Sequence, residues 1–125
     1  MVHGIGVDIL KINNLANSVS DISDPFVKKV YTEKELALIN SRSIPLNSFA
    51  TRFSGKEAVF KALSIHGNSI KLNEIEILEN EVGKPFVILH GRAKELAQDN
   101  GINQVLISLS YDTEYAISYA MALKI

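Results

Sequence analysis

The chain has 125 residues, of which 46% are hydrophobic and 22% are charged, and its formal net charge at pH 7 is -1. This length supports one hydrophobic core, so a single domain over residues 1–125 is expected, and the absence of cysteine excludes disulfides and thiolate metal sites. The near-neutral charge argues against a nucleic-acid partner, and neither a basic leader nor a run approaching ~20 apolar residues indicates export or a membrane span, so we expect a cytoplasmic protein.

The first predicted element is a strand over residues 2–10. Its apolar run is short and contains two glycines, which favours a strand over a helix. Asp8 interrupts this run. A single acid in such a place is either a strand-end group that caps a neighbouring turn or a functional carboxylate, and one residue does not decide between them.

Two short helices are predicted next. Asp24 is a favourable N-cap before Pro25, a residue that suits the first helical position. Thr32 and Glu35 have the spacing of a capping box, in which each side chain bonds the other residue's backbone N–H. The second of these helices is expected to reach about Asn40.

The longest predicted helix spans residues 46–65 and follows a loop over residues 41–45. At about 100° per residue, four of its apolar side chains fall within roughly 80° of one another and form one stripe: Phe49, Phe53, Phe60 and Leu63. Lys56 lies on the same stripe. Its ammonium must snorkel to water, which is the commoner arrangement, or meet an anion, because burying an unpaired charge is costly.

The middle of the chain is locally basic. Five basic residues stand against one acid, Glu57, in this stretch: Arg42, Arg52, Lys56, Lys61 and Lys71. Such a region can receive phosphates or an acidic protein, or it can be a solvated helix face. Glu57 and Lys61 share one face of the helix and also have the spacing of an ordinary surface ion pair.

The second half of the chain changes from helical to alternating patterns. Residues 75–77 alternate apolar and acidic side chains, residues 81–85 supply turn chemistry, and residues 86–89 are apolar, so a hairpin is predicted. A short helix over residues 92–100 should end at Gly101, which suits a left-handed cap.

A second antiparallel hairpin is predicted at the C-terminal end. Residues 105–109 and 115–123 both alternate, and residues 111–114 join them. Together, the elements predict an α+β fold in which the helices pack on one side of a mainly antiparallel sheet.

Asp8 and Glu57 are candidate metal ligands when they are taken together. They lie on separate rigid elements, and Mg²⁺ takes few protein carboxylates because phosphate oxygens and water fill its remaining positions. Lys56 and Lys61 could then neutralise the charge of a phosphoryl group during its transfer.

Four segments resemble the holo-acyl-carrier-protein synthases of the 4′-phosphopantetheinyl transferase family in order and spacing, over essentially the whole chain. They are Ile-Gly-Val-Asp-Ile at residues 5–9, the block from Arg52 to Ala62, Gly-Lys-Pro at residues 83–85, and Ile-Ser-Leu-Ser at residues 107–110. The Lys-Glu-Ala block followed by a second Lys-Ala is the most specific of these, and Gly-Lys-Pro alone would be weak.

The resemblance implies a magnesium ion held by Asp8 and Glu57, with Lys61 as a further catalytic residue at the phosphate. Coenzyme A would bind through its pyrophosphate, a serine of apo-acyl carrier protein would attack the β-phosphorus, and adenosine 3′,5′-bisphosphate would leave. The expected cofactor-binding residues are Arg52, Lys56, Lys61, Gly83, Lys84, Pro85, Ser110 and Tyr111. The resemblance also implies a role in fatty acid biosynthesis and a homotrimer whose active sites are shared between neighbouring subunits.

Three positions depart from the family pattern. Tyr111 stands where the family usually has histidine, which puts that residue's hydrogen bond or proton role in doubt, although tyrosine can still stack on the nucleotide. Asn14 stands where an arginine helps to grip the acidic carrier, and an amide cannot form a charged pair. Residues 64–67 replace a glycine-rich turn. His66 is expected to be a loop residue and not a metal ligand, and neither His3 nor His90 has a partner at metal-ligand spacing.

Two other functions use the same residues. A metal-dependent hydrolase of nucleotide pyrophosphates would need no carrier, and a catalytically weakened family member would survive as a carrier-binding or trimeric scaffold. The base for the serine proton is also open between Glu57, Asp8 acting through a metal-bound water, and a water near the phosphate. We favour a water activated by magnesium and oriented by one of the two carboxylates.

Overall fold

The computed structural model describes residues 1–65 and 69–125 of the chain. Its elements follow one another in this order: β1 (Val2–Lys11), η1 (Ile12–Leu15), α1 (Ala16–Val19), α2 (Pro25–Val30), α3 (Glu33–Asn40), α4 (Pro45–Leu63), η2 (Leu72–Glu74), β2 (Ile75–Glu79), β3 (Pro85–Leu89), α5 (Gly91–Asp99), β4 (Gln104–Tyr111) and β5 (Tyr115–Leu123). The predicted strands and longer helices are confirmed to within one or two residues. The short turns η1, α1 and η2 were not predicted, because three or four residues are too few to show a period.

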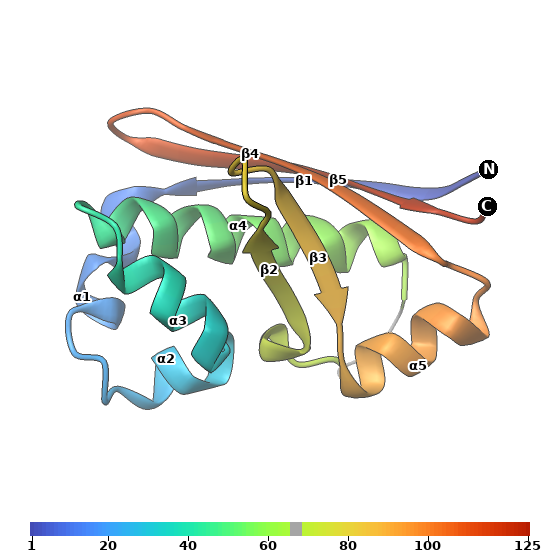
Figure 1. Cartoon of the computed structure of the whole chain (residues 1–125), viewed down its shortest axis with the longest axis horizontal. Helices are drawn as coiled ribbons and strands as arrows, with labels where there is room; N and C mark the ends of the chain where they lie inside the picture. Colours follow the sequence, from blue (N-terminus) through green and yellow to red (C-terminus); the bar gives the residue numbers. More distant parts are fainter. Residues whose placement is uncertain (66–68) are drawn as a thin grey trace.

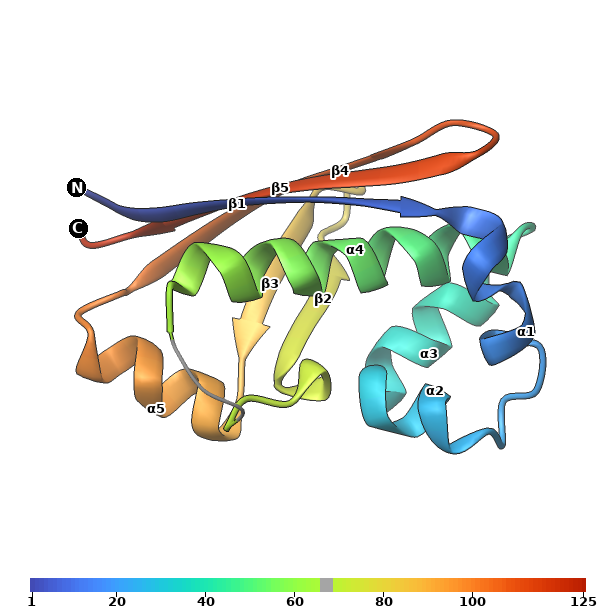
Figure 2. The same ribbon diagram turned by 180° about the vertical axis from the view of Figure 1, so that it is seen from behind.

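The five strands of the described residues form two separate antiparallel sheets. One has the order β1-β5-β4, and the other is the β2–β3 hairpin. Figures 1 and 2 show the three-stranded sheet as an outer layer with α4 running along it, while the other helices and the β2–β3 hairpin lie beyond α4. The predicted α+β fold with helices on one side of an antiparallel sheet is confirmed. Its division into two sheets was not foreseen.

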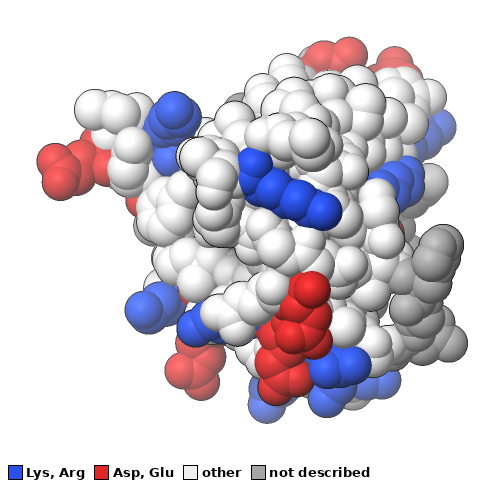
Figure 3. All heavy atoms as spheres, turned by 90° about the vertical axis from the view of Figure 1, so that its right-hand side faces the viewer, with Lys and Arg blue, Asp and Glu red and all other residues white. Residues whose placement is uncertain are grey.

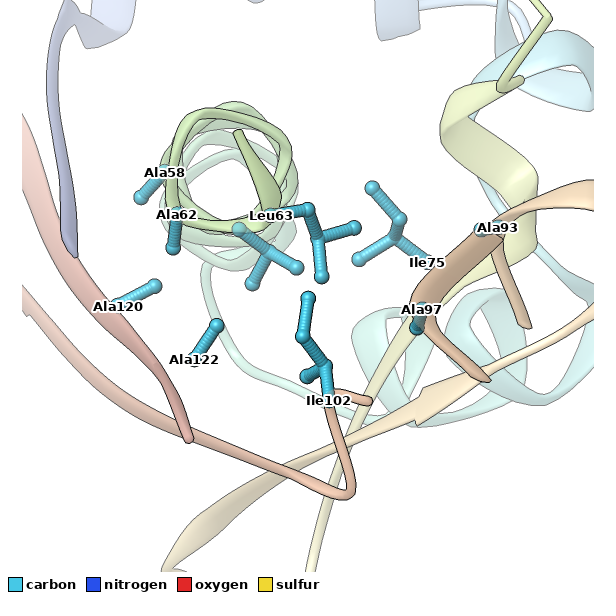
Figure 4. Close-up of a cluster of buried hydrophobic side chains, with 10 residues drawn as sticks. Ala58, Ala62, Leu63, Ile75, Ala93, Ala97, Ile102, Ala120 and Ala122 are labelled. Atoms are coloured by element: carbon cyan, nitrogen blue, oxygen red, sulfur yellow. The ribbon is translucent and has the colours of Figure 1, made fainter. Parts of the chain in front are cut away.

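Small residues let α4 lie close against the three-stranded sheet. Figure 4 shows Ala58 and Ala62 of α4 facing Ala120 and Ala122 of β5, all of them buried. On β1, a β-carbon at Gly6 would overlap the carbonyl oxygen of Ala58 and would lie 2.8 Å from the Ala62 nitrogen. This close approach fixes the relation between β1 and α4, the two elements that carry the predicted carboxylates.

The α4 helix is buried on more than one face, because the three-stranded sheet covers one side and other helices and the β2–β3 hairpin cover the other. The predicted apolar stripe is therefore only part of its buried surface, and Phe53 and Phe60 on that stripe are only partly buried. Lys56 is fully buried, and its Nζ donates to Glu35 Oε1 at 2.8 Å and to the carbonyl oxygen of Ile75 at 2.6 Å. The expectation that Lys56 snorkels to water is wrong, and it meets an anion instead.

The charged side chains do not form a field of one sign on the end of the molecule that carries the two termini. Acidic and basic side chains are interspersed there among neutral ones (Figure 3). Within residues 1–65 and 69–125, no helix combines the length and the apolar character needed to cross a bilayer.

Candidate active site

Asp8 is held against α4 by its own backbone. The hydroxyl of Ser54 on α4 donates to the carbonyl oxygen of Asp8 at 3.1 Å, and Gly6 allows β1 to approach the helix. In the sheet, Asp8 pairs with the buried Ser118 of β5. The Asp8 carboxylate is consequently presented at the junction of β1 and α4, with 18% of its side chain exposed.

Glu57 and Lys61 of α4 share this junction with Asp8. The Nζ of Lys61 lies 2.9 Å from the carbonyl oxygen of Val7 and 3.4 Å from Asp8 Oδ1. Burial raises the pKa of Glu57, the negative charge of Asp8 raises it further, and Lys61 opposes both effects. Two mutually repelling carboxylates and one ammonium therefore form a single cluster, which we call the carboxylate cluster.

The carboxylate cluster fits a divalent cation that takes only two protein ligands. A cation between Asp8 and Glu57 would relieve the repulsion that raises the pKa of Glu57. Among the described residues, no three histidine, cysteine or acidic side chains are grouped together as candidate metal ligands.

His3 and His90, the two histidines within the described residues, make their hydrogen bonds outside this cluster. His3 bonds the carbonyl oxygen of Leu63 at 2.9 Å, and His90 contacts Glu76 at 3.0 Å. His66, expected to be a loop residue, lies outside the described residues. Asn14, which departs from the family pattern, is an exposed residue of η1.

A second group of predicted residues lines a pocket near the β4 edge of the three-stranded sheet, the edge opposite β1. Arg52 and Tyr111 line a cavity of about 370 Å³, and an adjoining cavity of about 150 Å³ adds Gly83 and Pro85. We call these two cavities the Arg52 pocket. Their remaining lining residues are Arg42, Ser43, Ile44, Asn47, Ser48, Thr51, Glu79 and Leu109.

The guanidinium of Arg52 is fixed at the wall of this pocket. The residue is only 6% exposed, and its Nη2 donates to Glu79 Oε1 at 3.1 Å. Its Nε is buried and has no hydrogen-bond partner among residues 1–65 and 69–125. Burial lowers the pKa of Arg52, and the nearby Arg42 lowers it further. The pocket wall therefore carries the fixed positive charge of Arg52, which suits an anion.

Three predicted cofactor-binding residues lie elsewhere. Lys56 is sequestered in the core by Glu35, so its expected contact with phosphate is corrected to a structural role. Lys84 lines a different cavity, between β3 and β4, and Ser110 lies among the exposed positions of β4, paired with the outward Ile117. Neither Lys84 nor Ser110 lines the Arg52 pocket.

Within a single copy of the chain, the carboxylate cluster and the Arg52 pocket lie apart from each other. Asp8 is on β1, at one edge of the three-stranded sheet, and Tyr111 ends β4 at the other edge, with β5 between them. Arg52 and Glu57 are five residues apart on α4 and so point about 140° away from each other. The structure brings together the members of each group but does not bring the two groups together.

Two features of these sites were missed in the sequence. Glu79 and Arg42 contact each other in the Arg52 pocket, and no pattern in the sequence singles out Glu79. The outer sheet face was also missed. It consists of exposed apolar side chains at alternating positions: Ile5, Val7, Ile9, Leu106, Ile117 and Tyr119. The alternation in β1 and β5 was the available signal for this face.

The chain is similar to one group of known proteins along its whole length. A family model described as the 4′-phosphopantetheinyl transferase superfamily matches residues 4–120. The holo-[acyl-carrier-protein] synthase of Clostridium acetobutylicum is 40% identical over 121 residues, which is 97% of this chain and 97% of that protein. The solved structure of holo-[acyl-carrier-protein] synthase from Neisseria meningitidis superposes with a TM-score of 0.87 at 27% identity, covering 99% of this chain and 100% of that one. The Helicobacter pylori protein, solved in complex with coenzyme A, has a TM-score of 0.81 at 26% identity, with coverage of 95% and 99%.

Proposed function

Since the chain belongs to the 4′-phosphopantetheinyl transferase superfamily, and within it to the holo-[acyl-carrier-protein] synthases, we propose that its carboxylate cluster is the catalytic centre. The enzyme transfers 4′-phosphopantetheine from coenzyme A, and the acceptor in this proposal is a serine of an apo-acyl carrier protein. The observation that carries the assignment is the junction of β1 and α4, where Lys61 Nζ lies 3.4 Å from Asp8 Oδ1. Burial at this junction and the charge of Asp8 both raise the pKa of Glu57.

Asp8 and Glu57 are the proposed ligands of Mg²⁺. The ion supplies positive charge against the pyrophosphate of coenzyme A when it is bound. The two side chains come from elements that Gly6 and the Ser54 hydrogen bond hold together, so their separation does not depend on a loop. A site built on rigid elements keeps its geometry during the reaction.

Lys61 is the proposed phosphate contact. About half of its side chain is exposed, 52%, while its ammonium is held by Val7 and Asp8. In the transfer, the serine oxygen bonds to the β-phosphorus, the bond to the adenosine bisphosphate oxygen breaks, and that oxygen leaves with the electron pair. Lys61 stabilises the charge that builds up on the phosphoryl oxygens.

The proton of the attacking serine passes, in this proposal, to a water oriented by Asp8 or Glu57. The raised pKa of Glu57 supports its part, because burial and Asp8 make this carboxylate more basic than an ordinary one. The Arg52 pocket is the proposed nucleotide site, with Arg52 for phosphate and Tyr111 for stacking on the adenine or bonding to it.

We also propose that the active enzyme is a homotrimer whose sites are shared between copies. The separation of the carboxylate cluster from the Arg52 pocket supports this, because two copies placed edge to edge could join the cluster of one to the pocket of the other. The outer sheet face supports it as well, since Val7 pairs with Tyr119 and Ile9 with Ile117 to form a continuous apolar surface.

Residues 1–125 are proposed to act as one transferase domain in the cytoplasm. The carrier surface is proposed to lie near η1, where the exposed Asn14 replaces the arginine of the family pattern. An amide there removes one charged pair with an acidic carrier, so carrier affinity or carrier choice should differ from that of family members with the arginine.

Mass spectrometry tests the proposed function. The protein is incubated with coenzyme A, Mg²⁺ and an apo-acyl carrier protein, and the carrier is then weighed. A carrier mass increased by one phosphopantetheine, with one adenosine 3′,5′-bisphosphate released for each carrier modified, is the expected result. Release of nucleotide in the absence of carrier would indicate a hydrolase, and an unmodified carrier with no release would indicate a scaffold.

A further inference from the structure

Glu79, at the end of β2, stands between two arginines of the Arg52 pocket. Its Oε1 accepts from Nη2 of Arg52 at 3.1 Å and also from Nη2 of Arg42. Only 14% of the Glu79 side chain is exposed. One carboxylate oxygen is therefore shared by two guanidinium groups at the wall of a cavity.

The two arginines differ in freedom. Arg52 has 7% of its side chain exposed and is further held by Thr51, whose Oγ1 lies 3.4 Å from Nη1. Arg42 precedes α4 and has 42% of its side chain exposed. Arg52 therefore keeps its place through packing, whereas Arg42 depends more on Glu79.

The charges of this trio are not balanced. Two guanidinium groups and one carboxylate leave one positive charge, and the Nε of Arg52 remains buried without a partner among the described residues. A phosphate that enters the pocket would seek both guanidinium groups and would meet the negative charge of Glu79. The carboxylate already occupies Nη2 of each arginine, and these are two of the donors that a phosphate oxygen could use.

We propose that Glu79 is a positioning and affinity-limiting residue of the nucleotide pocket, where its carboxylate competes with a phosphate group of the nucleotide for Arg52 and Arg42. This inference rests on the proposed function, which places the nucleotide of coenzyme A in the Arg52 pocket. Glu79 holds the two like-charged arginines together in the empty pocket. When the nucleotide is bound, the same carboxylate weakens its hold, which favours release of adenosine 3′,5′-bisphosphate after transfer.

The Glu79→Gln variant separates the charge of this side chain from its shape. Glutamine keeps a carbonyl oxygen that can accept from Arg52, but it has no negative charge. The Kd for adenosine 3′,5′-bisphosphate, measured by isothermal titration calorimetry, should fall roughly tenfold, because one repulsive charge is removed at contact distance in a partly buried site. The KM for coenzyme A should fall in parallel, without a rise in kcat.

Two further variants serve as comparisons. Glu79→Ala removes both the charge and the acceptor, so Arg42 loses its position and the gain in affinity should be smaller than with glutamine. Glu81→Gln changes an exposed acid in the turn of the same hairpin and should leave the Kd unchanged. Thermal unfolding of each variant shows that the fold is retained.

The outcomes distinguish this inference from the function on which it rests. If the wild-type protein binds coenzyme A and Glu79→Gln binds the bisphosphate no more tightly than wild type, the competition does not exist and the inference is wrong, while the proposed function stands. If the wild-type protein binds neither coenzyme A nor the bisphosphate, both proposals fail together.

Discussion

Gly6 of β1 lies so close to Ala58 of α4 that a β-carbon on Gly6 would overlap the Ala58 carbonyl oxygen. Two residues after Gly6 comes Asp8, and one residue before Ala58 comes Glu57. The contact between two backbones thus sets the distance between two carboxylates. This close contact gives a physical reason for the glycine in the Ile-Gly-Val-Asp-Ile segment at residues 5–9, since a larger residue would separate the strand from the helix.

The first prediction follows from this contact. Gly6→Ala should lower the free energy of unfolding by roughly 1–3 kcal/mol through overpacking. The folded fraction of this variant should also have a lower transfer rate than wild type, because Asp8 moves away from Glu57. Chemical denaturation and the carrier mass assay measure the two effects. Lys11→Ala, at the exposed end of the same strand, is the control and should change neither. Full activity in a folded Gly6→Ala protein would show that the close approach is not needed.

A second prediction concerns the charge of Glu57. Glu57→Gln should lower the transfer rate by at least about 100-fold, as expected when a group that acts on developing charge is removed. It should not lower the unfolding temperature, because burial and Asp8 already disfavour the Glu57 carboxylate, as its raised pKa indicates. Removal of divalent cations with a chelator should abolish activity in the wild-type protein, and added Mg²⁺ should restore it.

Glu95→Gln on α5 is the control for Glu57, since Glu95 is an exposed acid whose ion pair is with its helix neighbour Arg92, at 3.0 Å. If the Glu57→Gln enzyme were active, Glu57 would not be a ligand of the proposed metal site.

Local chemistry explains how much of the fold could be predicted. The Asp24 side chain accepts from the Phe26 nitrogen at 2.9 Å, and Thr32 and Glu35 form the expected capping box. Gly101 has a φ of 74°, the left-handed value expected where α5 ends. Each of these signals involves residues that are neighbours in the sequence, so the sequence alone could reveal them.

The contacts that could not be predicted join residues far apart in the chain. Lys56 meets Glu35 across 21 positions, and Arg52 meets Glu79 across 27. No period or motif links such pairs, because only the tertiary fold brings them together. The grouping of Asp8 with Glu57 could be anticipated because the family resemblance supplied it, whereas the separation of the carboxylate cluster from the Arg52 pocket depends on the strand order.

The buried position of Lys56 leads to a third prediction. Lys56→Met should destabilise the protein by about 3–5 kcal/mol, because it leaves the fully buried Glu35 carboxylate without its cation. The double variant with Glu35→Gln should recover part of this loss, since the amide carries no charge. Urea denaturation measures both. At a temperature where Lys56→Met is folded, its KM for coenzyme A should match the wild-type value. A raised KM would show that Lys56 contributes to coenzyme A binding.

Tyr111 supports a fourth prediction. It is 57% exposed and lines both cavities of the Arg52 pocket, so its replacement should have little effect on stability. Tyr111→His should preserve or raise transfer activity if this position contacts the nucleotide, because it restores the residue usual in the family. Steady-state kinetics with varied coenzyme A measures this. A large loss of activity in the folded variant would show that the tyrosine has a different role in this chain.

The last prediction concerns Glu76, a buried acid of β2 whose carboxylate connects the N-caps of α3 and α5, Thr32 and His90, to the β2–β3 sheet. Its Oε2 accepts from the Thr32 hydroxyl at 2.5 Å and its Oε1 contacts His90 at 3.0 Å. Burial alone would raise the pKa of Glu76, but the hydrogen bonds from Thr32 and His90 outweigh burial and lower the pKa below its ordinary value of 4.5.

A lowered pKa in the folded state means that the native protein binds fewer protons at Glu76 than the unfolded chain does. The stability that Glu76 contributes is therefore fully present above pH 4.5 and is lost as the pH falls through the lower folded pKa. Glu76→Gln should cost about 1–2 kcal/mol at pH 7, and this difference from wild type should shrink in acid below pH 4.5. Urea denaturation from pH 7 to pH 3 measures it, with Glu33→Gln on the exposed face of α3 as the control. A cost that stays constant over this range would show that the carboxylate charge of Glu76 does not stabilise the fold.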